Sequence, residues 1–270
     1  MSAGTNPGPT LLALDTATET LCLAVCHGGQ VHTHQEAGGA AASARLLPAA
    51  RALLARAGTV LQAVDAIAFV QGPGAFTGLR TACAVAQGLG YGLERPLLPL
   101  DGLMLVAEDA AQALGASPLE VLVAMDARMD EVYAGRYRLE AGPGGPRWRV
   151  IEAPALWTLA ALSEACTGRS AELLAGSALA VFAERVNWPS APIRLAQPAD
   201  RAAALARLAM AAWADGATVP AAEGMPLYLR DKVASTTAER ALATASRLAA
   251  GLDGAATASP ATAPASGAAR

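Results

Sequence analysis

The sequence contains two similar stretches that each indicate a strand, a turn and a second strand. The first is LALDTATETLCLA, from residue 12, and the second is VAMDARMDEVYAG, from residue 123. In each, an apolar run ends in an aspartate, Asp15 or Asp126, and a second acidic residue follows four positions later. The similarity predicts a duplicated unit whose hairpins face a cleft, and chance similarity of two hairpins is the competing explanation.

Short apolar runs and amphipathic runs alternate along the chain and indicate an α/β fold. A Gly28-Gly29 turn is expected between two strands, and Ser43 is the expected N-cap of the first helix. We expect strands over 11–14, 21–26, 31–35, 66–70, 96–100, 121–125 and 131–139, helices over 43–57, 77–91, 102–114, 158–165, 178–186, 200–215 and 239–250, and an extended segment over 220–230.

The two ends of the chain have little capacity to fold. Residues 1–9 read as a loose leader. Beyond Leu252 the chain has no apolar side chain larger than alanine, so residues 251–270 cannot bury surface that would offset the entropy of ordering. We therefore expect a disordered leader and a disordered tail rich in alanine, threonine, serine and proline.

The charge balance argues against a protein that grips nucleic acid by itself. Charged residues make up 16% of the chain, and the formal net charge is −3. The sequence has no basic stripe of the kind that neutralises phosphates. We therefore expect any contact with RNA to pass through a partner protein.

The cysteines and the apolar runs indicate a cytoplasmic protein. The four cysteines form no CxxC pair, and buried free thiols suit a reducing compartment. We find no signal peptide and no apolar stretch long enough to span a bilayer, so no membrane contact is expected. The cysteines are Cys22, Cys26, Cys83 and Cys166.

Asp15 and Thr16 follow the first strand, where a hairpin could hold a phosphate and its metal. The actin-like ATPases and sugar kinases use a D-x-G-[TS] hairpin for this purpose. Here Ala17 takes the place of the glycine, and its methyl group crowds the backbone where phosphate would approach. An Asx-type turn stabilised by Asp15 is the alternative interpretation.

The segment QGPGAFTGLR, which follows a predicted strand and opens a helix, is the most specific motif. It is not a Walker A loop, because no lysine follows the last glycine. Its glycines, Gly72, Gly74 and Gly78, are out of register for a dinucleotide loop, and Pro73 and Phe76 stand where the backbone should meet pyrophosphate.

The helix that follows carries a small-residue stripe. Gly78, Ala82, Ala86 and Gly90 recur every four residues. Such a stripe lets another element approach closely. It packs either on the chain's own sheet or against a second subunit, and both interpretations stay open from the sequence.

Two further groups of polar residues could bind a ligand. Asp126, with Arg128 and Asp130, could do so, or could form a solvated turn with a local Arg–Asp pair. His32 and His34 share a strand face, so a metal pair is geometrically feasible, but an exposed hairpin is the favoured account. No HxxxH helix occurs.

Four segments occur in an order and spacing that resemble one family. They are LALDTATE, GPGAFTGLR, MDARMDEVYAG and PLYLRDKV. Together they resemble the TsaB family of the tRNA threonylcarbamoyladenosine pathway, over about residues 11–233. The specific block is GPGxFTGxR, with Gly72, Pro73, Gly74 and Thr77.

The resemblance implies a two-lobed actin-like ATPase fold, in which each lobe is ribonuclease-H-like. Each lobe should contain a mixed five-stranded sheet flanked by helices. The first lobe should span residues 10–110 and the smaller second lobe 111–233, with the helix near 200–215 a candidate to return to the first lobe.

The resemblance also implies a non-catalytic scaffold that activates a TsaD-like catalytic paralogue, with a TsaE-like small ATPase as a further partner. It implies a homodimer when the chain is alone, contact with tRNA only through the complex, and no catalytic or metal-binding residue of its own. We expect no tightly bound cofactor, with ATP or ADP only at the complex interface. The expected interface lies on helices 43–57 and 77–91 and includes Leu46, Ala50, Leu53, Phe76, Gly78, Arg80, Ala82 and Ala86.

Two other functions remain in competition. The chain could be an actin-fold ATP-dependent kinase or ATPase that uses Asp15 and Asp126. It could also be a metallopeptidase, which the shortage of metal ligands disfavours. The paralogue holds its metal through an HxxxH-type helix, and the equivalent residues here, 102–114, contain no histidine.

Overall fold

The first sheet contains five strands in the order β3-β2-β1-β4-β5. The pairs β1–β2 and β2–β3 are antiparallel, whereas β1–β4 and β4–β5 are parallel. The strands are β1 (Leu11–Asp15), β2 (Thr20–His27), β3 (Gln30–Ala37), β4 (Ala66–Gly72) and β5 (Leu97–Asp101).

The second sheet repeats this plan, with the order β10-β9-β6-β7-β8. Its pairs β6–β7 and β7–β8 are antiparallel, and its pairs β6–β9 and β9–β10 are parallel. The shared order and directions confirm the predicted fold class, two mixed five-stranded sheets flanked by helices. The strands are β6 (Leu119–Asp126), β7 (Glu131–Glu140), β8 (Arg147–Thr158), β9 (Leu173–Ala175) and β10 (Ile193–Leu195).

The computed structural model describes residues 8–115, 119–142, 145–197 and 199–230. The fold is that of the compact unit that ends at Leu229. The expectations for residues 1–7, for a helix over 239–250 and for the tail over 251–270 lie outside the described residues.

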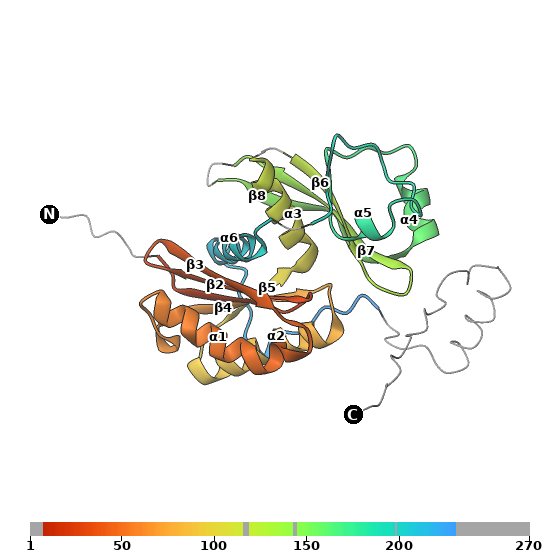
Figure 1. Cartoon of the computed structure of the whole chain (residues 1–270). Coiled ribbons are helices and arrows are strands. Elements are labelled where there is room, and N and C mark those ends of the chain that lie inside the picture. The colour runs from red at the N-terminus through yellow and green to blue at the C-terminus, as the bar shows by residue number, and fades with distance from the viewer. Residues whose placement is uncertain (1–7, 116–118, 143–144, 198, 231–270) are drawn as a thin grey trace, which may run out of the picture. The chain divides into compact units, whose positions relative to one another are not determined.

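Helices cover both faces of the first sheet, because β1, β2 and β4 are apolar on both faces. On one face, α1 (Ala42–Arg56) and α2 (Phe76–Leu93) pack on Leu12, Leu14 and their neighbours. On the other face, α6 (Arg201–Ala214) packs on Leu11, Ala13 and their neighbours. Figure 1 shows α1 and α2 below the sheet and α6 above it.

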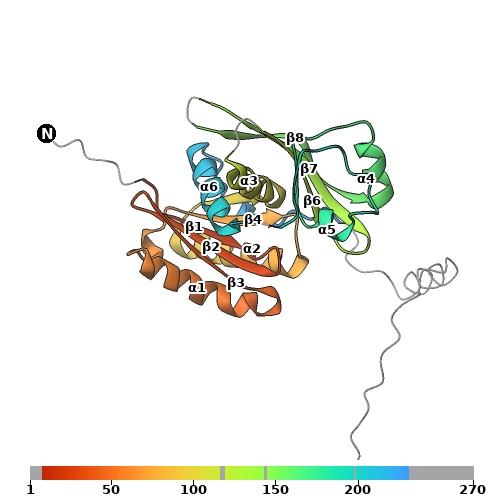
Figure 2. The ribbon, with the colours of Figure 1, turned by 45° about the horizontal axis from the view of Figure 1, so that its top comes forward.

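Helix α3 (Gly102–Leu114) contributes to both lobes. Its Leu105 joins the core of the first sheet, while Leu103 and Ala107 join a core with β6 and β7 of the second sheet. Figure 2 shows α3 beside α6. The other face of the second sheet is covered by α4 (Leu159–Cys166) and α5 (Ala178–Val181). Three short 3-10 turns complete the fold: η1 (Gly39–Ala41), η2 (Leu61–Ala63) and η3 (Ala221–Glu223).

Three details differ from the sequence-based expectations. Ser43 lies inside α1 and the N-cap is Ala41, which makes no side-chain capping bond. The helix expected over 178–186 ends at Val181. Strands β8, β9 and β10 were not expected from the sequence, because β8 contains a proline and the other two have three residues each.

Candidate functional site

The carboxylate at the end of β1 is bound by the chain's own arginine. Arg201, the first residue of α6, donates from Nε to Asp15 Oδ2 over 2.6 Å. The other oxygen, Oδ1, accepts a hydrogen bond from the Ala17 amide over 2.8 Å. Asp15 is 0% exposed and Arg201 is 5% exposed. Both oxygens of the Asp15 carboxylate are therefore already engaged within the chain.

The loop GPGAFTG packs directly against the turn after β1. Thr16 Oγ1 donates to the Gly78 carbonyl over 2.7 Å, and the Ala75 amide donates to the Ala17 carbonyl over 2.8 Å. A methyl group on Gly78 would overlap the Thr16 carbonyl, and one on Gly74 would lie 2.7 Å from Ala17. These glycines are needed for close backbone approach within the chain.

The remaining motif residues fix the end of β4. Gly72 and Pro73 are buried, and the Leu227 amide donates to the Gln71 carbonyl over 2.7 Å. A methyl group on Gly72 would lie 2.5 Å from the Leu227 carbonyl oxygen. Thr77 is exposed in the first turn of α2. The motif therefore holds β4, α2 and the segment 219–229 together.

The second hairpin places Asp126 in a similar turn. Its Oδ1 accepts from the Arg128 amide over 2.8 Å, and its Oδ2 lies 3.4 Å from Arg128 Nη1. Arg128 also lies 3.8 Å from Glu19 of the first hairpin, so the two hairpin turns face each other. The Arg128–Glu19 pair is well exposed and contributes at most about 1 kcal/mol to the stability of the fold. Asp126 is thus engaged locally, as the solvated-turn interpretation anticipates.

Most of the side chains predicted for a partner interface are buried in the chain itself. They lie in the core between α1, α2 and the first sheet, and a partner cannot reach them from outside. The prediction that these side chains contact a partner is therefore corrected, because they face the chain's own sheet. They are Leu46, Ala50, Leu53, Ala82 and Ala86, each at most 1% exposed.

The opposite side of α1 and α2 is exposed. We call it the outer helical face and define it by Leu47, Arg51, Ala84, Gly88 and Tyr91. Leu47 is 39% exposed and Tyr91 is 62% exposed. Among the described residues, no atom lies within 4 Å of a methyl group placed on Gly88. Small residues between two large apolar ones leave a shallow surface on which another helix could pack.

Phe76 and Arg80, also predicted for the interface, form a cluster with Tyr228. The Arg80 guanidinium lies 4.0 Å from the centre of the Phe76 ring, and its Nε donates to the Tyr228 hydroxyl over 3.0 Å. The two rings are 5.2 Å apart. Arg80 and Tyr228 are exposed, so this cluster remains accessible beside the outer helical face. No local pattern in the sequence indicates that the segment carrying Tyr228 returns to α2.

Two carboxylates, one at the N-cap of α3 and one within α3, tie the two lobes together. Asp101, at the start of α3, accepts from the Tyr137 hydroxyl over 2.8 Å and from the Leu103 amide. Burial raises the pKa of Asp101, although the hydrogen bond from Tyr137 opposes this shift. Glu108 accepts from Trp148 Nε1 over 2.7 Å and pairs with Arg207 of α6. These groups stabilise the lobe junction.

The described residues contain no group of three or more histidine, cysteine or acidic side chains that could hold a metal ion. Within the described part of the chain, no helix has the length and apolar character needed to cross a membrane. The four cysteines are free and buried, as predicted.

Sequence comparisons identify close relatives. The family described as "TsaD: tRNA N6-adenosine threonylcarbamoyltransferase" matches residues 28–162. The tRNA threonylcarbamoyladenosine biosynthesis protein TsaB of Escherichia coli (strain K12) is 33% identical over 235 residues, which cover 83% of this chain and 96% of that protein. TsaB of Haemophilus influenzae is 41% identical over 124 residues, which cover 46% of this chain and 52% of that protein.

A solved structure has a similar fold. YeaZ from Pseudomonas aeruginosa is 40% identical and superposes with a TM-score of 0.71. The match covers 82% of this chain and 100% of that structure. The similarity therefore includes both lobes.

Proposed function

Because the chain belongs to the TsaB family of tRNA threonylcarbamoyladenosine biosynthesis proteins, we propose that it serves this modification as a non-catalytic scaffold that binds and activates a TsaD-like catalytic paralogue. The observation that carries the proposal is the Asp15–Arg201 pair, which is buried and joined over 2.6 Å. A carboxylate that already holds a guanidinium is not free to hold a metal–phosphate complex. The chain then contributes by binding another protein.

The same pair argues against the competing kinase or ATPase function. That function needs Asp15 and Asp126 free to hold a metal and phosphates. Instead Asp15 binds Arg201 and Asp126 binds the amide and side chain of Arg128. We propose that the chain alone holds no cofactor tightly and that ATP or ADP binds only at the junction with the paralogue.

The outer helical face is the proposed docking surface for the paralogue. It is adjacent to the Phe76–Arg80–Tyr228 cluster, whose aromatic rings and guanidinium are of the types that dominate binding energy at interfaces. The same face would form a homodimer when the chain is alone. A TsaE-like ATPase then joins the complex. The chain contacts tRNA only indirectly, through that complex. The four buried free thiols are consistent with a cytoplasmic location.

The docking surface can be tested by placing a charge on it. Ala84→Glu and Gly88→Glu add a carboxylate to the exposed side of α2 without entering the core. Each should weaken binding to the purified paralogue by at least tenfold in calorimetry, because a carboxylate would be desolvated in the contact. Ala113→Glu, on the exposed side of α3, is the matched control and should bind normally. Unchanged binding of both α2 variants would refute this surface.

Nucleotide binding separates this proposal from the kinase function. Calorimetry of the isolated chain with Mg-ATP should show no tight binding. Micromolar binding that disappears in Asp15→Asn would favour the kinase interpretation instead.

A further inference from the structure

The two helices that form the outer helical face carry positive charge and no carboxylate. Neither α1 nor α2 contains an aspartate or a glutamate, although the whole chain has a formal net charge of −3. Arg45 on α1 is neutralised, because it pairs with Glu36 of β3 over 2.6 Å. The other basic residues of the two helices are Arg51, Arg56 and Arg80. The charge of these helices is therefore opposite in sign to that of the chain as a whole.

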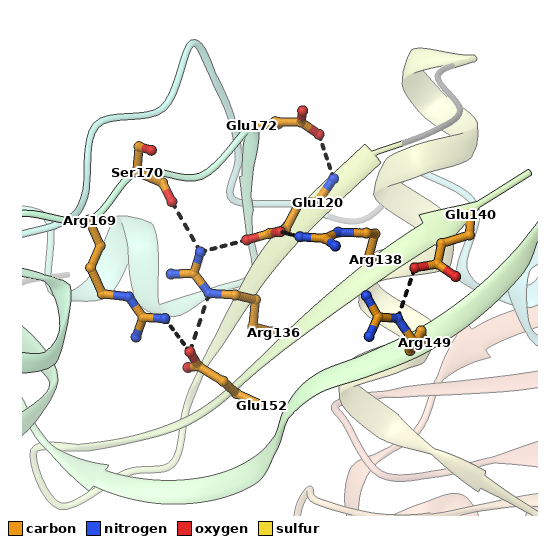
Figure 3. A network of polar contacts seen from close by, with 9 residues as sticks. All are labelled: Glu120, Arg136, Arg138, Glu140, Arg149, Glu152, Arg169, Ser170 and Glu172. Atoms are coloured by element: carbon orange, nitrogen blue, oxygen red, sulfur yellow. Dashed lines mark hydrogen bonds and ion pairs between the residues drawn. The ribbon is translucent and has the colours of Figure 1, made fainter.

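Most arginines of the second lobe, in contrast, are neutralised within the chain. Figure 3 shows guanidinium groups of this lobe paired with carboxylates. Arg136 Nη1 lies 2.8 Å from Glu120 Oε1, and Arg149 Nε lies 2.8 Å from Glu140 Oε1. An ion pair of this kind presents little net charge to an approaching partner.

The remaining arginines of α1 and α2 have no such compensation. Arg56 and Arg80 donate to uncharged acceptors, the Thr33 carbonyl and the Tyr228 hydroxyl. Within the described part of the chain, Arg51, Arg56 and Arg80 form no ion pair, and all three are exposed. Their positive charges therefore act on whatever approaches this side of the molecule.

The rest of the outer helical face suits a helix better than a nucleic-acid backbone. Leu47 and Tyr91 are exposed apolar side chains, and Ala84 and Gly88 are small and exposed. Small and apolar side chains allow another helix to pack closely. A phosphate backbone, by comparison, is held by a longer row of cations.

Arg80 is oriented for a carboxylate before any partner binds. Its guanidinium lies 4.0 Å from the centre of the Phe76 ring, and its Nε donates to the Tyr228 hydroxyl over 3.0 Å. Its terminal nitrogens make no hydrogen bond to any of the described residues. A planar guanidinium held in this way can donate two parallel hydrogen bonds to one carboxylate.

We propose that the docking surface selects an acidic helical surface of the TsaD-like paralogue, whose carboxylates pair with Arg51 on the outer helical face and with Arg80 beside it. The inference rests on the proposed function, because it names the chemistry that the paralogue presents at that docking surface. A symmetric dimer pairs a surface with its own copy, so a homodimer through this face brings like charges together. Charge therefore favours the paralogue over a second copy of the chain.

Salt distinguishes the two contacts, because it screens attraction in one and repulsion in the other. Calorimetry with the purified paralogue should show that binding weakens about tenfold when sodium chloride rises from about 0.05 M to about 0.5 M. A homodimer through this face, measured by analytical ultracentrifugation, should instead tighten over the same range.

Charge variants assign the effect to the two arginines. Arg51→Gln and Arg80→Gln should each weaken paralogue binding at low salt by about threefold to tenfold and reduce its salt dependence. Arg51→Lys keeps the charge and should retain that salt dependence. Arg194→Gln is the matched control, because Arg194 is an exposed arginine on β10 of the second lobe, and it should bind like the wild type.

Binding that is equally tight at both salt concentrations, or glutamine variants that bind like the wild type, would overturn the charge complementarity and leave the docking surface standing. A homodimer that weakens as salt rises would overturn it as well. Absence of paralogue binding at both concentrations would refute the proposed function together with this inference. Binding of tRNA to the isolated chain that disappears in Arg51→Gln with Arg80→Gln would show that the arginines take phosphate, and would also overturn the proposal.

Discussion

Removing one partner of the Asp15–Arg201 pair should destabilise the fold strongly. Arg201→Met keeps an unbranched apolar stem but leaves the Asp15 carboxylate buried, with only the Ala17 amide as a donor. Breaking a buried pair in this way costs about 3–5 kcal/mol. For a domain of 150–250 residues, about 2–4 °C of melting temperature is lost per kcal/mol. Together these values predict a fall of about 6–20 °C.

Urea denaturation and thermal melting followed by circular dichroism would measure this loss. The double variant Asp15→Asn with Arg201→Met should be more stable than Arg201→Met alone, because it also removes the unpaired charge. Arg149→Met is the matched control, since it breaks an exposed pair with Glu140 and should cost less than about 1 kcal/mol. If Arg201→Met costs no more than this control, or if the two substitutions are additive, the reasoning about the buried pair is wrong.

Two further predictions concern α2 and the lobe junction. Gly78→Ala should lower the free energy of unfolding, measured in urea, by about 1–3 kcal/mol, because its methyl group meets the Thr16 carbonyl. Gly88→Ala, on the exposed side of α2, should instead stabilise the fold by up to about 1 kcal/mol, and equal effects of the two variants would contradict the assigned orientation of α2. Burial raises the pKa of Asp101 in the folded state, so ionisation of Asp101 costs stability as pH rises through that pKa. The stability of the wild type relative to Asp101→Asn should therefore increase as pH falls from 7 toward 4. A stability difference that is constant with pH would contradict burial as the cause.

The strands that the sequence predicted are those with continuous apolar runs. β1 and β4 are buried on both faces, so nearly every residue in them is apolar and the pattern is plain. β8 lies at the edge of its sheet, where Pro154 and alternating arginines are tolerated, so its sequence resembles a loop. Tertiary pairing with β7 stabilises it, and a single sequence does not reveal that pairing.

The candidate site was predictable only in part. Asp15 was identified from its place after a strand, but its partner Arg201 is 186 residues away and no local pattern links them. One signal was present: Arg201 is at helical spacing from Leu205 and Leu208, which are both buried, so the charge lies on the buried side of α6. A charge on a buried helix face requires a partner.

The inner and outer sides of α2 could not be distinguished from the sequence, because alanine and glycine occur on both. Ala82 and Ala86 face the sheet, whereas Ala84 and Gly88 face outward. Periodicity of small residues identifies a close approach but does not tell which neighbour makes it. The sheet beneath α2 buries Ala82 and Ala86, so we propose the other side of the same helix as the docking surface.

The most direct test of the account is transfer of the threonylcarbamoyl group to tRNA by the purified TsaD-like paralogue together with the other components of the reaction. Wild-type chain should restore modification, the chain without the paralogue should yield none, and the double variant Ala84→Glu with Gly88→Glu should fail to restore it while Ala113→Glu succeeds. Modified tRNA formed by this chain without the paralogue, or full activity with the double variant, would contradict the account.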